Sequence, residues 1–84
     1  MKKFTTILNF DFSAREVAKF NEIVYNYTSQ IIIIYEGREA NAKSLLGLFD
    51  LKIKKGAVLS FGISGSDEGD ARDVIEKFFR EKRG

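Results

Sequence analysis

The chain has 84 residues, of which 44% are hydrophobic and 31% are charged, with a formal net charge of +2, so we expect one domain spanning residues 1–84 with a modest core. It contains no histidine and no cysteine, which excludes chemistry by either side chain, a disulfide framework and a zinc site built from them. Its 14 basic and 12 acidic residues are too evenly balanced to predict direct nucleic-acid binding, and no apolar run approaches the roughly 18 residues of a membrane span.

Alternating side chains predict that the chain opens with a strand. Phe4, Thr6, Leu8 and Phe10 share one face of a period-2 pattern that is rich in aromatic and β-branched residues. We expect this strand to end near Phe10.

A capping box predicts the start of the first helix. In Ser13-Ala14-Arg15-Glu16, the Ser13 hydroxyl can accept a hydrogen bond from the Glu16 amide while the Glu16 side chain reaches back to the Ser13 amide. Apolar residues at helical spacing follow, so we expect the helix to run to about Thr28. They are Val17, Phe20, Val24 and Tyr27.

The middle of the chain predicts two strands and a brief helix. Gln30–Glu36 is strongly β-branched and too short for a helix with its own core, so it is expected to be a central strand. After a turn at Gly37, Arg38–Ala42 should pair back as a short polar edge strand. Ser44 can then cap a helix over Leu45–Leu51.

The last third predicts a strand and a helix after a turn at Lys54-Lys55-Gly56. Ala57–Ser64 alternates as a half-buried strand. Asp67, Glu68 and Asp70 lie where the final helix begins and basic residues lie where it ends, which matches the helix dipole better than a metal site. The expected buried stripe is Ala71, Val74, Ile75, Phe78 and Phe79. The whole order predicts an α+β domain, a single sheet covered by helices on one face.

Three segments carry short motifs. Asn41–Gly47 reads NAKSLLG, Lys55-Gly56 is followed eight residues later by SGSDE at Ser64–Glu68, and Ala14-Arg15 precedes the first helical turn. Together these resemble the HPr family, the small phosphocarrier of the bacterial sugar phosphotransferase system, whose regulatory serine segment has the form N-x-K-S-[IL]-[ML]-G. The resemblance covers essentially the whole chain. It implies an HPr-like open-faced β-sandwich, a four-stranded antiparallel sheet with three helices on one face in the order βαββαβα.

The departure from the family pattern falls on its chemistry. Where the family has G-[IL]-H-A-R-P, residues 11–16 read DFSARE, so Ser13 occupies the position of the phosphoacceptor histidine. A serine phosphate is a stable ester, and the chain has no imidazole to activate the hydroxyl. We therefore predict that Ser13 is a helix cap and that the protein has no catalytic residue, is not an enzyme, and needs no cofactor or metal.

Ser44 is the residue to which the resemblance assigns regulation. The residues alone favour a plain helix cap. Because the family motif around Ser44 is intact, the resemblance implies phosphorylation by an HPr kinase/phosphorylase-like kinase. A phosphate would bring up to two negative charges to a surface that partners read, which makes a switch and not a carrier.

Apolar residues crowd the short helix that follows Ser44. One short helix cannot easily bury all of Leu45, Leu46, Leu48, Phe49 and Leu51, so either some of them are exposed or all five belong to the core. In the family the corresponding helix lies beside the active-site loop and contacts partners. The partner-binding residues that we expect from this are Phe12, Arg15, Leu45, Leu46 and Phe49.

Within the family, the sequence resembles the Crh branch, which lacks the histidine and keeps the serine. That resemblance implies a cytoplasmic regulatory protein in carbon catabolite regulation, whose phosphorylated form binds a LacI-type transcription regulator or a metabolic enzyme. Two alternatives stay open. One is a phosphocarrier with Ser13 as an atypical acceptor. The other is an interaction module that docks unmodified, or a homodimer formed by strand exchange, without a membrane partner.

Overall fold

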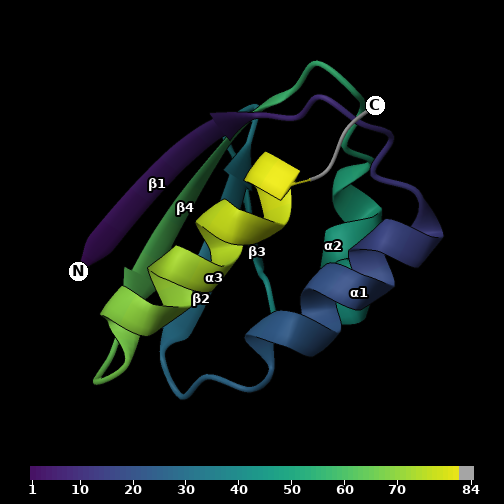
Figure 1. The fold of residues 1–84 in the computed structure, drawn as a ribbon. Helices are drawn as coiled ribbons and strands as arrows, with labels where there is room; N and C mark the ends of the chain where they lie inside the picture. Colours follow the sequence, from purple (N-terminus) through teal and green to yellow (C-terminus); the bar gives the residue numbers. More distant parts are fainter. Residues whose placement is uncertain (82–84) are drawn as a thin grey trace.

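The computed structural model describes residues 1–81, which form one four-stranded sheet and three helices (Figure 1). Every predicted element is present in the predicted order. The elements are β1 (Lys2–Ile7), α1 (Ala14–Val24), β2 (Gln30–Tyr35), β3 (Arg38–Asn41), α2 (Leu45–Leu51), β4 (Val58–Ser64) and α3 (Glu68–Glu81). No helix in residues 1–81 is long and apolar enough to cross a membrane.

The sheet order is β1-β4-β2-β3, and every pair of neighbouring strands is antiparallel. The β-branched strand β2 is central, between β4 and β3, and the polar strand β3 lies at the edge, as the sequence predicts. The α+β class and the order βαββαβα are confirmed.

One face of the sheet is covered and the other is open. Leu59, Phe61 and Ile63 of β4 and Ile31 and Ile33 of β2 are buried on the covered face. All three helices lie on that side, with α3 crossing in front of the strands and α1 beside α2 (Figure 1). The alternate residues of each strand project from the open face.

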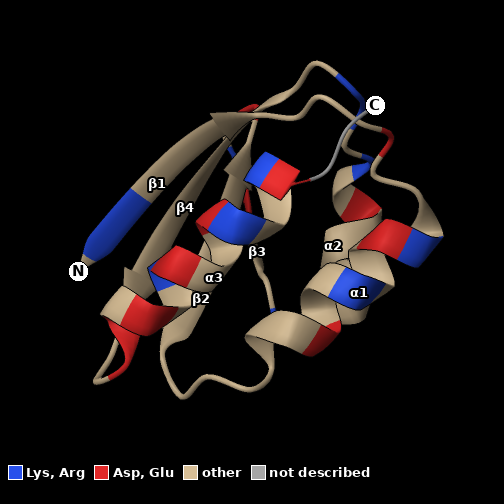
Figure 2. Cartoon of the chain, in the orientation of Figure 1, with Lys and Arg blue, Asp and Glu red and all other residues tan. Residues whose placement is uncertain are grey.

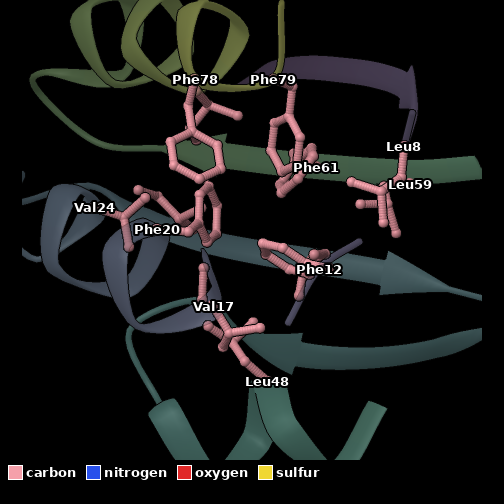
Figure 3. Packing of buried hydrophobic residues seen from close by; sticks show 14 of the residues in the cluster. Leu8, Phe12, Val17, Phe20, Val24, Leu48, Leu59, Phe61, Phe78 and Phe79 are labelled. Carbon is pink, nitrogen blue, oxygen red and sulfur yellow. The ribbon is translucent and has the colours of Figure 1, made fainter. Parts of the chain in front are cut away.

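Phenylalanine rings form the centre of the core. Phe20 of α1 is fully buried, and its ring lies 5.4 to 6.0 Å from the rings of Phe12, Phe61, Phe78 and Phe79. Figure 3 shows the Phe78 ring pointing from α3 toward Phe20 and the Phe79 ring pointing toward Phe61 on the sheet. Each buried ring contributes about 1.5–3 kcal/mol to folding. These residues therefore fix where α1 and α3 sit on the sheet.

Two predicted boundaries are wrong. The strand β1 ends at Ile7, not near Phe10, although Leu8 continues the pairing through its amide to the Ala57 carbonyl at 2.8 Å. Phe10 instead turns into the core against Phe78 and Phe79.

The first helix ends at Val24, four residues before the expected Thr28. The amides of Asn26 and Tyr27 bond to carbonyls three residues earlier, which is the tighter pattern of a helix that is terminating. At the other end of the chain, Lys82 and Arg83, expected in the last turn of α3, lie outside the described residues.

Candidate functional site

Ser13 occupies the N-cap position of α1, but its side chain does not cap the helix. Its carbonyl accepts from the Val17 amide at 2.9 Å, whereas its hydroxyl makes no capping hydrogen bond. The Ser13 half of the predicted capping box is therefore wrong. The first turn is exposed at Ser13, Ala14 and Arg15, so water can satisfy the amides that the side chain leaves free.

An open depression of about 520 Å³ lies beside Ser13. It is lined by Asp11, Phe12, Ser13, Ile53, Lys54 and Lys55. The sequence assigned both lysines only to a turn, and no local pattern links them to a serine about forty residues away. The depression therefore brings two exposed lysines and the Asp11 carboxylate to the same part of the surface as Ser13.

Ser44 is an N-cap in both position and bonding, as predicted. Its hydroxyl accepts from the Gly47 amide at 3.2 Å, and its carbonyl accepts from the Leu48 amide at 3.0 Å. Gly47 has a reason to lack a side chain, because a Cβ there would lie 3.2 Å from the Ser44 hydroxyl oxygen. The Ser44 side chain is itself exposed, so its hydroxyl is accessible to a modifying enzyme.

The segment before Ser44 is tied to α1 and to the loop that follows α1 by two side chains that sequence reasoning missed. Asn21 donates from its side-chain amide to the Ala42 carbonyl at 3.2 Å, and the Lys43 ammonium donates to the Tyr27 carbonyl at 2.5 Å. Asn21 is one of the polar residues of α1, and such residues are usually expected to face solvent. These bonds fix the position of Ser44 relative to α1.

The apolar residues of α2 divide into two sets. Leu48 and Leu51 are buried, whereas Leu45, Leu46 and Phe49 are exposed, and Leu46 is 76% exposed. Leu45 and Phe49 are one turn apart and share a helix face. We call Leu45, Leu46 and Phe49 the α2 surface; it begins at the residue after Ser44.

Phe12 does not belong to an exposed docking surface, which corrects the sequence prediction. The side chain is only 8% exposed, and its ring packs against Phe10, Phe20 and Phe79. Figure 3 shows Phe12 among the buried side chains of the core. Its ring lies between Phe20 of α1 and Phe79 of α3, and burial there is favourable for so large an apolar group. Arg15 is exposed on the first turn of α1, as a docking role requires.

The acidic residues at the start of α3 act mainly on neighbouring loops. Asp67 accepts from the Ser29 hydroxyl at 2.5 Å and from the amides of Thr28 and Ser29 at 2.8 and 2.9 Å. Led by the Ser29 hydroxyl, these hydrogen bonds lower the pKa of Asp67 to about 2. Glu68 accepts from the Gly65 amide at 3.1 Å, which also lowers its pKa. The sequence predicts only a helix-dipole role for Asp67, because its hydrogen-bond partners Thr28 and Ser29 are far from it in sequence.

Comparisons with known proteins point to a single family. Residues 1–81 match the family model described as the PTS HPr component phosphorylation site. The HPr-like protein Crh of Halalkalibacterium halodurans is 33% identical over 69 residues, which is 82% of each chain. The phosphocarrier protein HPr of Cupriavidus necator is 32% identical over 76 residues, covering 89% of this chain and 85% of that one.

Solved structures agree with this assignment. HPr-C-His from Thermoanaerobacter tengcongensis superposes with a TM-score of 0.84 at 31% identity, covering 98% of this chain and 99% of that one. Bacillus subtilis Crh, described as a swapped dimer, superposes with a TM-score of 0.76 at 26% identity, covering 100% and 97%. The four-stranded sheet, with Ser13 and Ser44 before the first two helices, agrees with these comparisons. The chain belongs to the HPr family and is similar to Crh.

Proposed function

We propose that this protein is a non-enzymatic regulatory member of the HPr family whose binding state is set by phosphorylation of Ser44. The observation that carries this proposal is the position of the Ser44 hydroxyl, which is exposed, held by the Gly47 amide, and adjacent to the exposed apolar residues of the α2 surface. A modification at Ser44 is therefore made next to the surface that a partner would contact.

The charge that phosphorylation adds is large for this chain. A phosphoserine carries about −1.5 to −2 charges at pH 7. The unmodified chain has a formal net charge of +2, so one phosphate brings the net charge close to zero. The new charge lies beside Leu45, where an unmodified partner interface would be apolar. One phosphate can thus change both the affinity and the choice of partner.

A partner of this kind would use aromatic and arginine contacts. Phe49 and Leu46 offer apolar anchors, and Arg15 offers a planar fork for a carboxylate or phosphate group. We propose an HPr kinase/phosphorylase-like kinase as the modifying enzyme and a LacI-type transcription regulator or a metabolic enzyme as the reader, all in the cytoplasm. The Crh branch of the family supplies this expectation.

Phosphate relay through Ser13 is not part of the proposal. A relay needs a phosphoryl group that leaves easily, and a serine ester does not supply one. Glu16, one helical turn along from Ser13, is a carboxylate on the same segment and adds no positive charge to help the reaction. Loss of the histidine removes the relay while the fold is retained.

The test is incubation with an HPr kinase/phosphorylase and ATP, followed by intact-protein mass measurement. We expect one phosphate on the wild type and on Ser13→Ala, and none on Ser44→Ala. Ser13 is a matched control because it is also an exposed N-cap serine in the same chain. An unmodified wild type, or a phosphate that persists in Ser44→Ala, would refute the switch.

The second candidate, a carrier that uses Ser13, has one observation in its favour. The Ser13 hydroxyl makes no capping bond and opens on a depression with Lys54 and Lys55. Enzyme I with phosphoenolpyruvate separates the two functions. A label that can be passed on, and that disappears in Ser13→Ala, would establish the carrier.

A partner that binds the phosphorylated and unmodified protein equally would instead establish an unmodified interaction module.

A further inference from the structure

The open face of the sheet has an apolar centre that no helix in residues 1–81 covers. Ile7 and Val58 are 65% and 57% exposed on this face, and Ile32 and Ile34 of β2 are half-buried there. The face is hollowed by a depression of about 400 Å³. Its lining includes Ile32, Ile34, Ser60 and Gly62, together with Lys3 and Glu39.

Large and small side chains stand next to each other across the two central strands. In the antiparallel register Ile32 of β2 pairs with Gly62 of β4, and Ile34 pairs with Ser60. A two-fold axis parallel to the strands and midway between β2 and β4 superposes β2 of one molecule on β4 of another. Each Ile32 then faces the Gly62 of the second copy, and each Ile34 faces its Ser60. The face is complementary in shape to itself.

The charges at the edges of the face obey the same symmetry. Lys3 lies on the edge strand β1 and Glu39 on the opposite edge strand β3, and both line the depression. Figure 2 shows basic residues at the start of β1. The same two-fold axis places β1 of one molecule over β3 of the other. Lys3 then lies over the second copy's Asn41, two residues along the strand from Glu39. That offset is about 7 Å, which the long lysine side chain can span, and the symmetry produces the contact twice.

We propose that the open face of the sheet binds a second copy of this chain, forming a symmetric dimer with the two sheets face to face. Sheets in this arrangement pack about 10 Å apart, which lets the isoleucines of one enter the hollow of the other. This dimer differs from strand exchange, because β1 stays paired with β4 in its own molecule.

The size of the face predicts weak and rapidly reversible association. Four strands spaced about 4.8 Å apart and about 20 Å long give a footprint of about 400 Å² per copy. A standard stable interface buries about 800 Å² per partner. Dimerisation should therefore appear only at high protein concentration and should reverse on dilution.

Sedimentation equilibrium of the full chain from about 10 μM to 1 mM tests the proposal. We expect the average mass of the wild type to rise with concentration and to fall again on dilution. In Gly62→Val the dissociation constant should rise at least about tenfold, because the new side chain fills the hollow. The monomer should tolerate this change, since a Cβ at Gly62 meets no atom within 4 Å. A thermal unfolding curve checks that the variant is folded.

Charge reversal provides a second, independent arm. Lys3→Glu should raise the dissociation constant about fivefold, and adding Glu39→Lys should restore it to within about twofold. Leu46→Ala, on the α2 surface, should leave it unchanged. The proposal is overturned if the wild type stays monomeric at 1 mM, if folded Gly62→Val associates like the wild type, if Leu46→Ala abolishes association, or if a dimer persists after dilution as strand exchange would require.

Discussion

The carboxylate of Asp67 holds the buried residue Ser29 by two hydrogen bonds, one from the hydroxyl at 2.5 Å and one from the amide at 2.9 Å. Ser29 immediately precedes β2, and Asp67 immediately precedes α3. The pair therefore ties together two connections that are 38 residues apart in sequence. Ser29 is the one buried polar residue in the described part of the chain, and Asp67 is what satisfies it.

This relationship predicts how stability depends on pH. The pKa of Asp67 is about 2 in the folded protein against an ordinary value of 3.8, so the folded state favours the charged form. The stabilisation is present above pH 3.8 and is lost as the pH falls toward 2. We expect the free energy of unfolding, measured with urea at a series of pH values, to drop in that window.

Asp67→Asn should be less stable at pH 7 and should show a smaller drop below pH 4. Asp70→Asn is the matched control, because it removes a carboxylate from the same end of α3 without removing these hydrogen bonds. An unchanged profile in Asp67→Asn would contradict this account. Ser29→Ala should cost about 1 kcal/mol by removing the buried donor.

Gly65 is required by its contact with the same serine. It has a φ of 154°, and a Cβ there would lie 2.7 Å from the Ser29 Cα and 2.6 Å from its hydroxyl oxygen. Gly65→Ala should therefore destabilise the protein by about 1–3 kcal/mol in chemical denaturation. At Gly69, inside α3, an added Cβ meets nothing within 4 Å. Gly69→Ala should instead stabilise by up to about 1 kcal/mol. Equal effects at the two glycines would show that close packing against Ser29 is not the cause.

The sequence predicts the elements well because their signals are local. Alternation at residues 57–64 and the β-branched run of β2 suffice to identify the two central strands, and the apolar spacing in α1 and α3 identifies their buried faces. The family motifs then supply the topology, which no local pattern contains.

The site is predicted less well because its geometry depends on distant residues. Phe12 is buried only because Phe20 and Phe79 arrive beside it from two helices. Lys54 lines the depression beside Ser13 because the chain that follows α2 returns to the start of α1. The missing cap at Ser13 is a matter of one side-chain orientation. Sequence spacing fixes none of these.

Truncation of Phe12 should cost more stability than truncation of Phe49. Phe12→Ala removes a ring from the core and should cost about 3–5 kcal/mol in urea unfolding. Phe49 is 37% exposed on α2, so Phe49→Ala should cost less, about 1–2 kcal/mol. If the α2 surface docks a partner, Phe49→Ala should weaken that binding while the protein stays folded. A large loss of stability in Phe49→Ala would mean that its ring is part of the core.

The two N-cap serines allow a direct comparison of a bonded and an unbonded cap. Ser44→Ala removes a hydroxyl that accepts from the Gly47 amide, and should cost about 1 kcal/mol. Ser13→Ala removes a hydroxyl that caps nothing, and should change stability by less than about 0.5 kcal/mol. Thermal or urea unfolding of both variants measures the difference.

The same pair of variants connects stability to the proposed switch. Because Ser44 is both a cap and the proposed phosphorylation site, a failure of Ser44→Ala to bind a partner has two explanations, a loosened α2 and a missing phosphate. Ser44→Asp separates them, since an aspartate is also a good N-cap and carries a negative charge. We expect Ser44→Asp to be about as stable as the wild type. If it is as unstable as Ser44→Ala, the cap is specific to the hydroxyl, and binding defects at this position must be corrected for the unfolded fraction before they are assigned to the phosphate.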